Sequence, residues 1–290
     1  MFKGIITAII TPFREGKIDF KALAKIINYQ AGNEIKAIVV GGSTGEGLLL
    51  STEMKLQLFE KAIEYNQGRM KIIASTGTPS TTETLALSQK AEALGADALL
   101  IISPWYVKPS QESLFQHFKT IHEGTNLPII IYNHPGRCGV DITPETVGKL
   151  SELPRIVGFK DSSPDLSRVP AIRSIANPRM KLFAGNDDTA AGYLALGGAG
   201  IICVASNAVP SAYVQLFHAW EKGDLAAFQK HCDTLYPLVC ATNLETNPAP
   251  VKYAVHLLGL CSTESLLPYV PLKETTRSAI KNALKELGLR

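Results

Sequence analysis

Residues 91–100 read Ala-Glu-Ala-Leu-Gly-Ala-Asp-Ala-Leu-Leu, which joins the end of a helix, a glycine and the start of a strand. Glycine commonly follows a helix because it adopts the left-handed backbone conformation without a steric penalty. The apolar run that follows has the unbroken hydrophobicity of a strand buried on both faces. Residues 194–202 repeat this joint as Leu-Ala-Leu-Gly-Gly-Ala-Gly-Ile-Ile. The recurrence predicts helices that return the chain to successive parallel strands.

Eight short apolar runs are expected to be strands, and their starts are about 19 to 36 residues apart, which leaves room for a helix between neighbours. These runs are Ile5–Ile10, Ile35–Val40, Lys71–Ser75, Asp97–Ile102, Pro128–Tyr132, Arg155–Lys160, Lys181–Ala184 and Gly200–Val204. Helical periodicity occupies Phe20–Tyr29, Thr52–Tyr65, Thr82–Leu94, Gln111–His122 and Pro144–Leu150, and returns after the last strand at Ala212–Lys222, Leu225–Leu238, Pro250–Leu258 and Glu274–Leu287.

Eight strand-then-helix units predict an α/β fold, a (β/α)8 TIM barrel, followed by a C-terminal helical appendix. An open doubly wound sheet is the structural rival, but no GxGxxG motif follows an early strand. We expect the barrel to occupy residues 1–223 and the helical region residues 224–290. Barrel enzymes place their sites on the loops after the strands, so candidate residues are sought there.

Composition narrows the possible partners and the compartment. The 290 residues are 46% hydrophobic and 19% charged with a formal net charge of +3, which fits a globular chain and gives no basic stripe for nucleic acid. No apolar run reaches the roughly 18 residues of a membrane-spanning helix. The five cysteines are an odd number without CxxC spacing, which predicts a reducing, cytoplasmic location.

Two neighbouring strand ends carry candidate catalytic side chains. Lys160 ends one strand with the same parity as Ile156 and Gly158, so it is expected to point into the barrel mouth. Burial there would favour the neutral amine, which attacks ketones and aldehydes to form a Schiff base. Tyr132 ends the preceding strand, where its phenol could move protons. The alternatives are a lysine paired with Asp161 or another carboxylate, and a tyrosine that only fills the barrel top.

Two loops offer anion-binding groups. Arg137 lies five residues after Tyr132, where its guanidinium could hold a carboxylate in two hydrogen bonds, or could be only a solvated loop arginine. The segment Gly41-Gly42-Ser43-Thr44-Gly45-Glu46-Gly47 could bind a carboxylate or phosphate through its backbone N–H groups, or could be a plain strand-to-helix turn. It lacks the lysine of a nucleotide-binding P-loop.

Metal chemistry has little support in the sequence. The six histidines form neither an HxH nor an HExxH pattern: His117, His122, His134, His218, His231 and His256. The polar run Asn186-Asp187-Asp188 could ligate a cation but is more typical of a helix N-cap. No metal site is expected.

Several of these motifs coincide in order and spacing with one family. The segments Gly41–Glu46, Tyr132–Gly139 and Val157–Lys160, together with Ser103–Tyr106 and Asn247–Lys252, resemble those of the 4-hydroxy-tetrahydrodipicolinate synthases, formerly called dihydrodipicolinate synthases. The resemblance covers essentially the whole chain. It implies a (β/α)8 barrel with C-terminal helices.

The resemblance implies that Lys160 forms a Schiff base with pyruvate, whose enamine attacks the aldehyde of L-aspartate 4-semialdehyde. It implies a proton relay of Tyr132, Thr44 and Tyr106, with Tyr106 supplied to the neighbouring subunit. Substrate-binding roles follow by the same resemblance for Ser43, Thr44, Arg137, Gly185 and Ile202. No cofactor is implied, and the expected assembly is a homo-oligomer, a tetramer of tight dimers.

Two other functions stay open. Ser43 stands where the synthases often have a second threonine, and the Gly-Ser-Thr-Gly-Glu form also occurs in N-acetylneuraminate lyases and 2-keto-3-deoxy-sugar aldolases. Arg137 favours the synthases, because its place in the Tyr-Asn-x-Pro-x-Arg pattern is theirs and the neuraminate lyases lack it. A non-catalytic keto-acid sensor is a third possibility, although such a protein would have no need to keep all of Lys160, Tyr132, Thr44, Tyr106 and Arg137.

Overall fold

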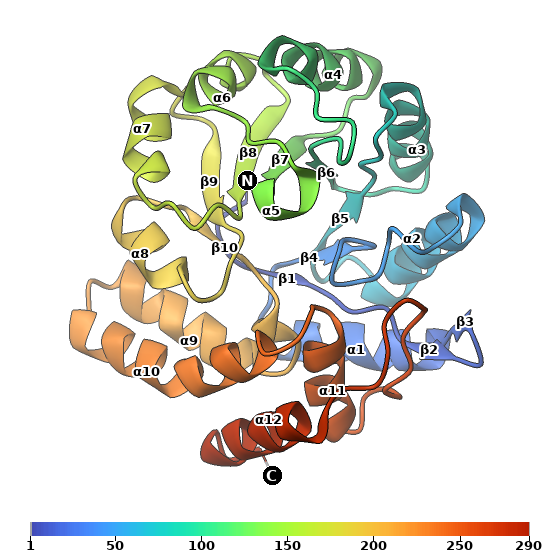
Figure 1. Ribbon diagram of the computed structural model, residues 1–290, viewed down its shortest axis with the longest axis vertical. Coiled ribbons are helices and arrows are strands. Elements are labelled where there is room, and N and C mark those ends of the chain that lie inside the picture. Colours follow the sequence, from blue (N-terminus) through green and yellow to red (C-terminus); the bar gives the residue numbers. More distant parts are fainter. Residues whose placement is uncertain (1, 290) are drawn as a thin grey trace. The chain divides into compact units, whose positions relative to one another are not determined.

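The computed structural model of the chain describes residues 2–289 and contains the expected eight parallel strands (Figure 1). Their order in the sheet, β1-β10-β9-β8-β7-β6-β5-β4, is that of a closed barrel. The predicted (β/α)8 fold is therefore confirmed. The barrel strands are β1 Gly4–Ala8, β4 Ala37–Val40, β5 Lys71–Ser75, β6 Ala98–Ile102, β7 Ile129–Asn133, β8 Ile156–Asp161, β9 Lys181–Ala184 and β10 Gly200–Cys203.

The helices follow the nine predicted periodic segments, with three additional helices, α5, α7 and α8. They are α1 Phe20–Gly32, α2 Thr52–Asn66, α3 Thr81–Ala93, α4 Gln111–Gly124, α5 Pro135–Cys138, α6 Pro144–Ser151, α7 Arg168–Ile175, α8 Ala190–Ala195, α9 Pro210–Glu221, α10 Leu225–Thr242, α11 Ala249–Leu257 and α12 Glu274–Glu286, with a 3-10 turn at Ala205–Asn207. Within residues 2–289 no helix is long and apolar enough to cross a bilayer.

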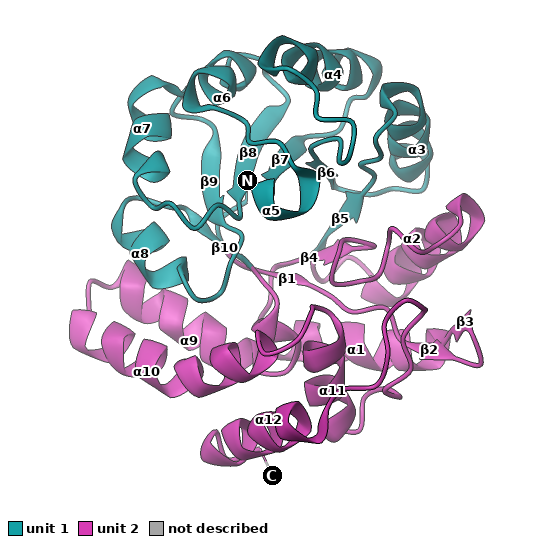
Figure 2. Cartoon of the chain, viewed as in Figure 1, with its two compact units in different colours: residues 1–4, 71–202 teal, residues 5–70, 203–290 magenta. Residues whose placement is uncertain are grey.

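Two compact units divide the chain (Figure 2). Unit 1 comprises residues 71–202 with the N-terminal residues up to Gly4, and unit 2 comprises residues 5–70 and 203–290. This division differs from the expected boundary after residue 223, which stays a prediction.

Unit 1 repeats the strand-to-helix unit, and its helices α3, α4, α6 and α7 follow one another along the outside of strands β5 to β9 (Figure 1). The glycine joints of the sequence are present: Gly95 follows α3 at a φ of 94° and Gly197 follows α8 at 100°. All five residues of β6 are buried, as expected for a strand covered on both faces. The helix α8 has Thr189 as its N-cap residue, so the cap expected within residues 186–188 was wrong by one position.

Unit 2 holds the first strands and the C-terminal helices. Strand β1 pairs in parallel with β4, and a small antiparallel hairpin, β2 Phe13–Arg14 and β3 Lys17–Ile18, follows β1. Helix α1 begins where the Asp19 carboxylate accepts from the N–H of Ala22, which satisfies one of the unpaired donors of a helix start. The hairpin was not expected, because two-residue strands carry no periodicity.

Candidate active site

Lys160 and Tyr132 face one another on adjacent strands of unit 1. The two residues are register partners of β8 and β7, and the Nζ of Lys160 lies 4.1 Å from the centroid of the Tyr132 ring. Lys160 is 4% exposed and Tyr132 is 7% exposed. Paired residues of parallel strands point to the same side of the sheet, so the expected adjacency of amine and phenol is confirmed.

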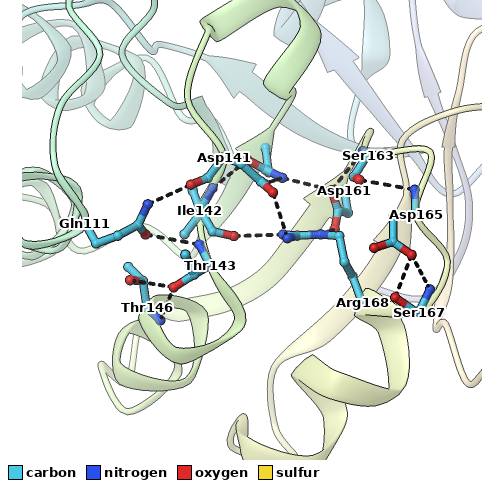
Figure 3. A network of polar contacts seen from close by, with 11 residues as sticks. Gln111, Asp141, Ile142, Thr143, Thr146, Asp161, Ser163, Asp165, Ser167 and Arg168 are labelled. Carbon is cyan, nitrogen blue, oxygen red and sulfur yellow. Dashed lines mark hydrogen bonds and ion pairs between the residues drawn. The ribbon is translucent and has the colours of Figure 1, made fainter.

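The amine of Lys160 has no carboxylate partner among the residues that the structure describes. Asp161 is the next residue along β8 and points to the opposite face, where its carboxylate accepts from Arg168 at 2.9 Å and from Asn133 at 3.0 Å (Figure 3). The alternative of a Lys160–Asp161 ion pair is therefore wrong. A buried lysine that nothing neutralises leaves its nitrogen available to a carbonyl carbon.

The phenol of Tyr132 has one hydrogen-bond partner among residues 2–289. Its oxygen accepts a long hydrogen bond of 3.4 Å from the hydroxyl of Ser162, the second residue after Lys160. Since the oxygen accepts there, the phenolic hydrogen can point elsewhere. The site can thus combine a nucleophilic amine with a proton donor and acceptor.

Gly185 is required by a close approach of two strand ends. Its N–H donates to the carbonyl of Asp161 at 2.7 Å. A Cβ at position 185 would lie 2.2 Å from the Ser162 Oγ and 2.8 Å from the Asp161 oxygen. The other expected pocket residue, Ile202, is fully buried in β10. Gly185 therefore lets the end of β9 lie against the end of the strand that carries Lys160.

Arg137 lies on α5, a single helical turn that directly follows β7. Its side chain is exposed and makes no ion pair with any residue between positions 2 and 289.

His134 lies beside Tyr132, with 5.9 Å between the two ring centroids. Burial, and then the positive charges of Arg137 and Lys160, lower the pKa of His134 to about 4. His134 is therefore neutral near pH 7.

Tyr106 lies in the loop after β6 and is, among residues 2–289, the most exposed of the large hydrophobic residues, at 90%. Its φ of 70° is in the left-handed region, which non-glycine residues rarely occupy. Its N–H donates to the carbonyl of Cys138 at 3.3 Å, so this loop contacts the segment that carries Arg137.

Cys138 is no nucleophile: its thiol donates to the Ser103 carbonyl, and burial raises its pKa to about 11.

Ser43 and Thr44 belong to unit 2, where the glycine-rich turn doubles back on itself. The N–H of Gly47 donates to the carbonyl of Gly42 at 3.0 Å. A Cβ at Gly47 would lie 1.7 Å from the carbonyl oxygen of Gly41, so only glycine fits. The turn is thus more constrained than a plain strand-to-helix connection requires.

Thr44 is held by a residue whose role the sequence did not reveal. The side-chain amide of Asn247 donates to the Thr44 Oγ1 at 3.1 Å, and Thr44 is 3% exposed. Because this oxygen accepts from Asn247, its own hydrogen can be donated to another group. Asn247 lies in a segment that was singled out only for its resemblance to the family.

Glu46, in the same turn, forms a buried ion pair with Lys252 of α11. The side chains are 0% and 1% exposed. The other carboxylate oxygen of Glu46 accepts from the N–H of Leu266 at 2.8 Å, and Lys252 also donates to the carbonyl of Glu264 at 2.9 Å. This pair ties the turn of Ser43 and Thr44 to the segment after α11.

The described part of the chain holds no group of three or more histidine, cysteine, aspartate or glutamate residues arranged to bind a metal ion. Two of the histidines, His117 and His122, are buried on α4. His117 accepts from or donates to the hydroxyl of Thr81 at 2.9 Å.

Comparisons with known proteins match the whole chain. The model of the dihydrodipicolinate synthetase family matches residues 1–287. The 4-hydroxy-tetrahydrodipicolinate synthase of Rhodospirillum centenum is 42% identical over 289 residues, which span 100% of this chain and 99% of that protein. The crystal structure of dihydrodipicolinate synthase from Aquifex aeolicus superposes with a TM-score of 0.97 at 37% identity, covering 99% of each chain. A monomeric dihydrodipicolinate synthase variant also has a TM-score of 0.97, at 38% identity over 100% of this chain and 98% of that one.

Proposed function

This chain belongs to the dihydrodipicolinate synthetase family, and on that premise we propose that it condenses pyruvate with L-aspartate 4-semialdehyde to give 4-hydroxy-tetrahydrodipicolinate. The reaction makes it a lyase that forms a lysine Schiff base and carries out the first committed step of lysine and diaminopimelate biosynthesis. The observation that carries the proposal is the buried, unpaired amine of Lys160 beside the phenol of Tyr132.

The chemistry begins at the nitrogen of Lys160. The amine attacks the ketone carbon of pyruvate, and loss of water gives an imine. Loss of a proton from the pyruvate methyl group gives an enamine, whose carbon attacks the aldehyde carbon of the semialdehyde. The amino group of the adduct then displaces Lys160 from the imine carbon, which closes the ring and frees the enzyme.

The remaining residues have proposed roles in binding and proton transfer. Tyr132 passes protons to and from the carbinolamine, and Thr44 with Tyr106 extends the relay. Ser43 and Thr44 hold the pyruvate carboxylate. Arg137 holds the carboxylate of the semialdehyde in paired charge-assisted hydrogen bonds, which its exposed and unpaired guanidinium supports. Gly185 and Ile202 shape the pocket, and no cofactor takes part.

The proposed assembly is a homotetramer of tight dimers, in which Tyr106 serves the neighbouring subunit. Its 90% exposure and left-handed backbone support a residue that a second chain covers. We place the enzyme in the cytoplasm, without nucleic-acid or membrane partners. All five cysteines are free of disulfides, which suits a reducing compartment.

Borohydride trapping tests the reaction. With pyruvate present, reduction should fix an adduct on the peptide that contains Lys160, and Lys160→Ala should abolish it. Adding the semialdehyde should give product in the wild type. An adduct on another lysine would refute the assignment of the nucleophile. Rapid cleavage of N-acetylneuraminate or 2-keto-3-deoxy sugars without turnover of the semialdehyde would instead identify a different pyruvate aldolase.

A further inference from the structure

A set of polar contacts closes the base of the loop that carries Arg137. This loop, residues 134–140, leaves β7 after Asn133 and ends before Asp141. The Asn133 side-chain amide donates to the Asp141 carboxylate at 2.7 Å, and its oxygen accepts from the N–H of Ile142 at 3.1 Å. One side chain at the strand end therefore binds both residues at which the loop returns.

Arg168, on α7, joins this loop base to the strand of Lys160 (Figure 3). Its guanidinium donates to the Asp161 carboxylate at 2.9 Å, to the Asp141 carboxylate at 2.9 Å and to the carbonyl of Ile142 at 2.8 Å. Arg168 is 7% exposed. Because the guanidinium is a rigid plane with fixed donor directions, these three bonds set the position of the loop base relative to the residue after Lys160.

The outer side of the loop base is held from α4. The side-chain amide of Gln111 donates to the backbone oxygen of Asp141 at 2.7 Å, and its oxygen accepts from the N–H of Thr143 at 3.1 Å. Asp141 thus has neighbours on both sides, while only its carboxylate contacts Asn133 and Arg168. A change confined to that carboxylate leaves the Gln111 contacts in place.

The loop needs an external support of this kind. Its only helix, α5, has four residues, and a single turn gains little stability of its own. Arg137 lies in that turn with an exposed side chain and no ion-pair partner in residues 2–289, so its own contacts do not fix its position. The distance between Arg137 and Lys160 therefore depends on the two ends of the loop, together with the contacts that Cys138 makes with Ser103 and Tyr106.

We propose that Asp141 is a positioning residue that holds Arg137 at the correct distance from Lys160, and that it thereby determines how well the enzyme selects the carboxylate of its second substrate. This inference rests on the proposed function, because it assigns Arg137 to the semialdehyde. It predicts a defect in the condensation with the semialdehyde but not in Schiff-base formation with pyruvate, since pyruvate reacts at Lys160 before the semialdehyde binds to Arg137.

Asp141 is the member of the network that is best suited to a test. Its side chain is 44% exposed, whereas those of Arg168 and Asp161 are 8% and 2% exposed. Its carboxylate accepts from two donors, the Asn133 amide and the Arg168 guanidinium. In Asp141→Asn the new amide oxygen can still accept from one of these two donors, but the other donor faces an NH2 group. The variant therefore loses one hydrogen bond while the side chain keeps almost the same volume.

Asp165→Asn is the matched control. It removes the same charge three residues before Arg168. Within residues 2–289 the Asp165 carboxylate accepts hydrogen bonds from the N–H and hydroxyl of Ser167 and from no residue of the loop. Each variant is assayed for kcat/KM with both substrates and for the rate of borohydride trapping with pyruvate alone. A normal rate of trapping with pyruvate also shows that the end of β8, which carries Lys160, remains folded in the variant.

Asp141→Asn should lower kcat/KM for the semialdehyde by about tenfold, as expected for a binding group misplaced by a fraction of an ångström, and should change pyruvate trapping by less than about twofold. Asp165→Asn should match the wild type in both. The double variant with Arg137→Ala should be no worse with the semialdehyde than Arg137→Ala alone, because Asp141 acts through Arg137.

Three results would overturn the inference: a semialdehyde defect equal to that of Asp165→Asn, an equal loss in both half-reactions, and full additivity with Arg137→Ala. Asp141→Ala repeats the test without introducing a new donor, and loss of both half-reactions in that variant also counts against positioning. A wild type that neither traps pyruvate nor uses the semialdehyde would refute the proposed function itself, which is a distinct outcome.

Discussion

The buried pair of Glu46 and Lys252 gives the sharpest prediction about the stability of unit 2. The change is Lys252→Met, which removes the ammonium and keeps a side chain of similar length. The ammonium lies 4.5 Å from the centroid of the Phe13 ring, a position that a thioether also occupies favourably. In this variant the carboxylate of Glu46 keeps, among residues 2–289, only the hydrogen bond that it accepts from the N–H of Leu266.

The magnitude follows from the burial of both partners. With side chains 0% and 1% exposed, neither charge can recover solvation when the other is removed. Removal of one partner from such a pair costs about 3 to 5 kcal/mol. For 290 residues the entropy of unfolding is about 0.6 kcal/mol/K near the midpoint, so the loss lowers Tm by about 5 to 8 °C. Adding Glu46→Gln removes the stranded charge while keeping an acceptor for Leu266, and should restore at least about 2 kcal/mol.

The assay is urea unfolding at pH 7 for the wild type, Lys252→Met, Glu46→Gln and the double variant. The prediction is that the double variant is more stable than Lys252→Met, although it carries one more substitution. A Lys252→Met variant within about 1 kcal/mol of the wild type would refute the reasoning, because a buried, uncompensated carboxylate costs more than that. A double variant no more stable than Lys252→Met would show that the two charges are not coupled.

Two further predictions concern unit 1. Gly185→Ala should destabilise the protein by about 1 to 3 kcal/mol, measured by thermal unfolding. Gly136→Ala is the control and should cost less, because a Cβ at position 136 would meet only the His134 ring, at 3.7 Å. Equal costs would contradict the close approach at the end of β9. Burial lowers the pKa of His117 from 6.5 to about 4, so the unfolded state binds the extra proton as the pH falls. Between pH 7 and 5 the wild type should therefore lose about 2 kcal/mol more than His117→Gln in urea titrations, and parallel losses would exclude this role.

The barrel could be predicted from sequence because its signals are local. The joint at residues 91–100 carries a helix end, a glycine and a strand in one segment, and Gly95 has the left-handed backbone that the pattern requires. The pairing of Lys160 with Tyr132 followed from two strand ends with matching parity. In both cases the information lies within a few residues of chain, or in the regular geometry of parallel strands.

The supports of the site could not be predicted, because they join positions far apart in the chain. Asn247 contacts Thr44 across 203 positions. Glu46 was interpreted as part of an anion-binding turn, and only the structure pairs it with Lys252. Gly185 was expected to line a pocket, which stays a prediction, and the sequence did not show that a Cβ there would collide with the end of the neighbouring strand β8. No periodicity or spacing encodes such contacts, since each depends on where the fold brings two distant backbones together.

Arg168 has a second consequence for the chemistry. Asp161 directly follows Lys160, and Asp141 directly follows the loop of Arg137, so each carboxylate lies close in the chain to a nitrogen group for which we propose a role with substrate. Arg168 binds both carboxylates. A carboxylate already engaged by a buried guanidinium has little to gain from a second cation, because its charge is compensated and its oxygens are occupied. Arg168 therefore leaves the side chains of Lys160 and Arg137 available for the substrate-binding roles that we propose for them.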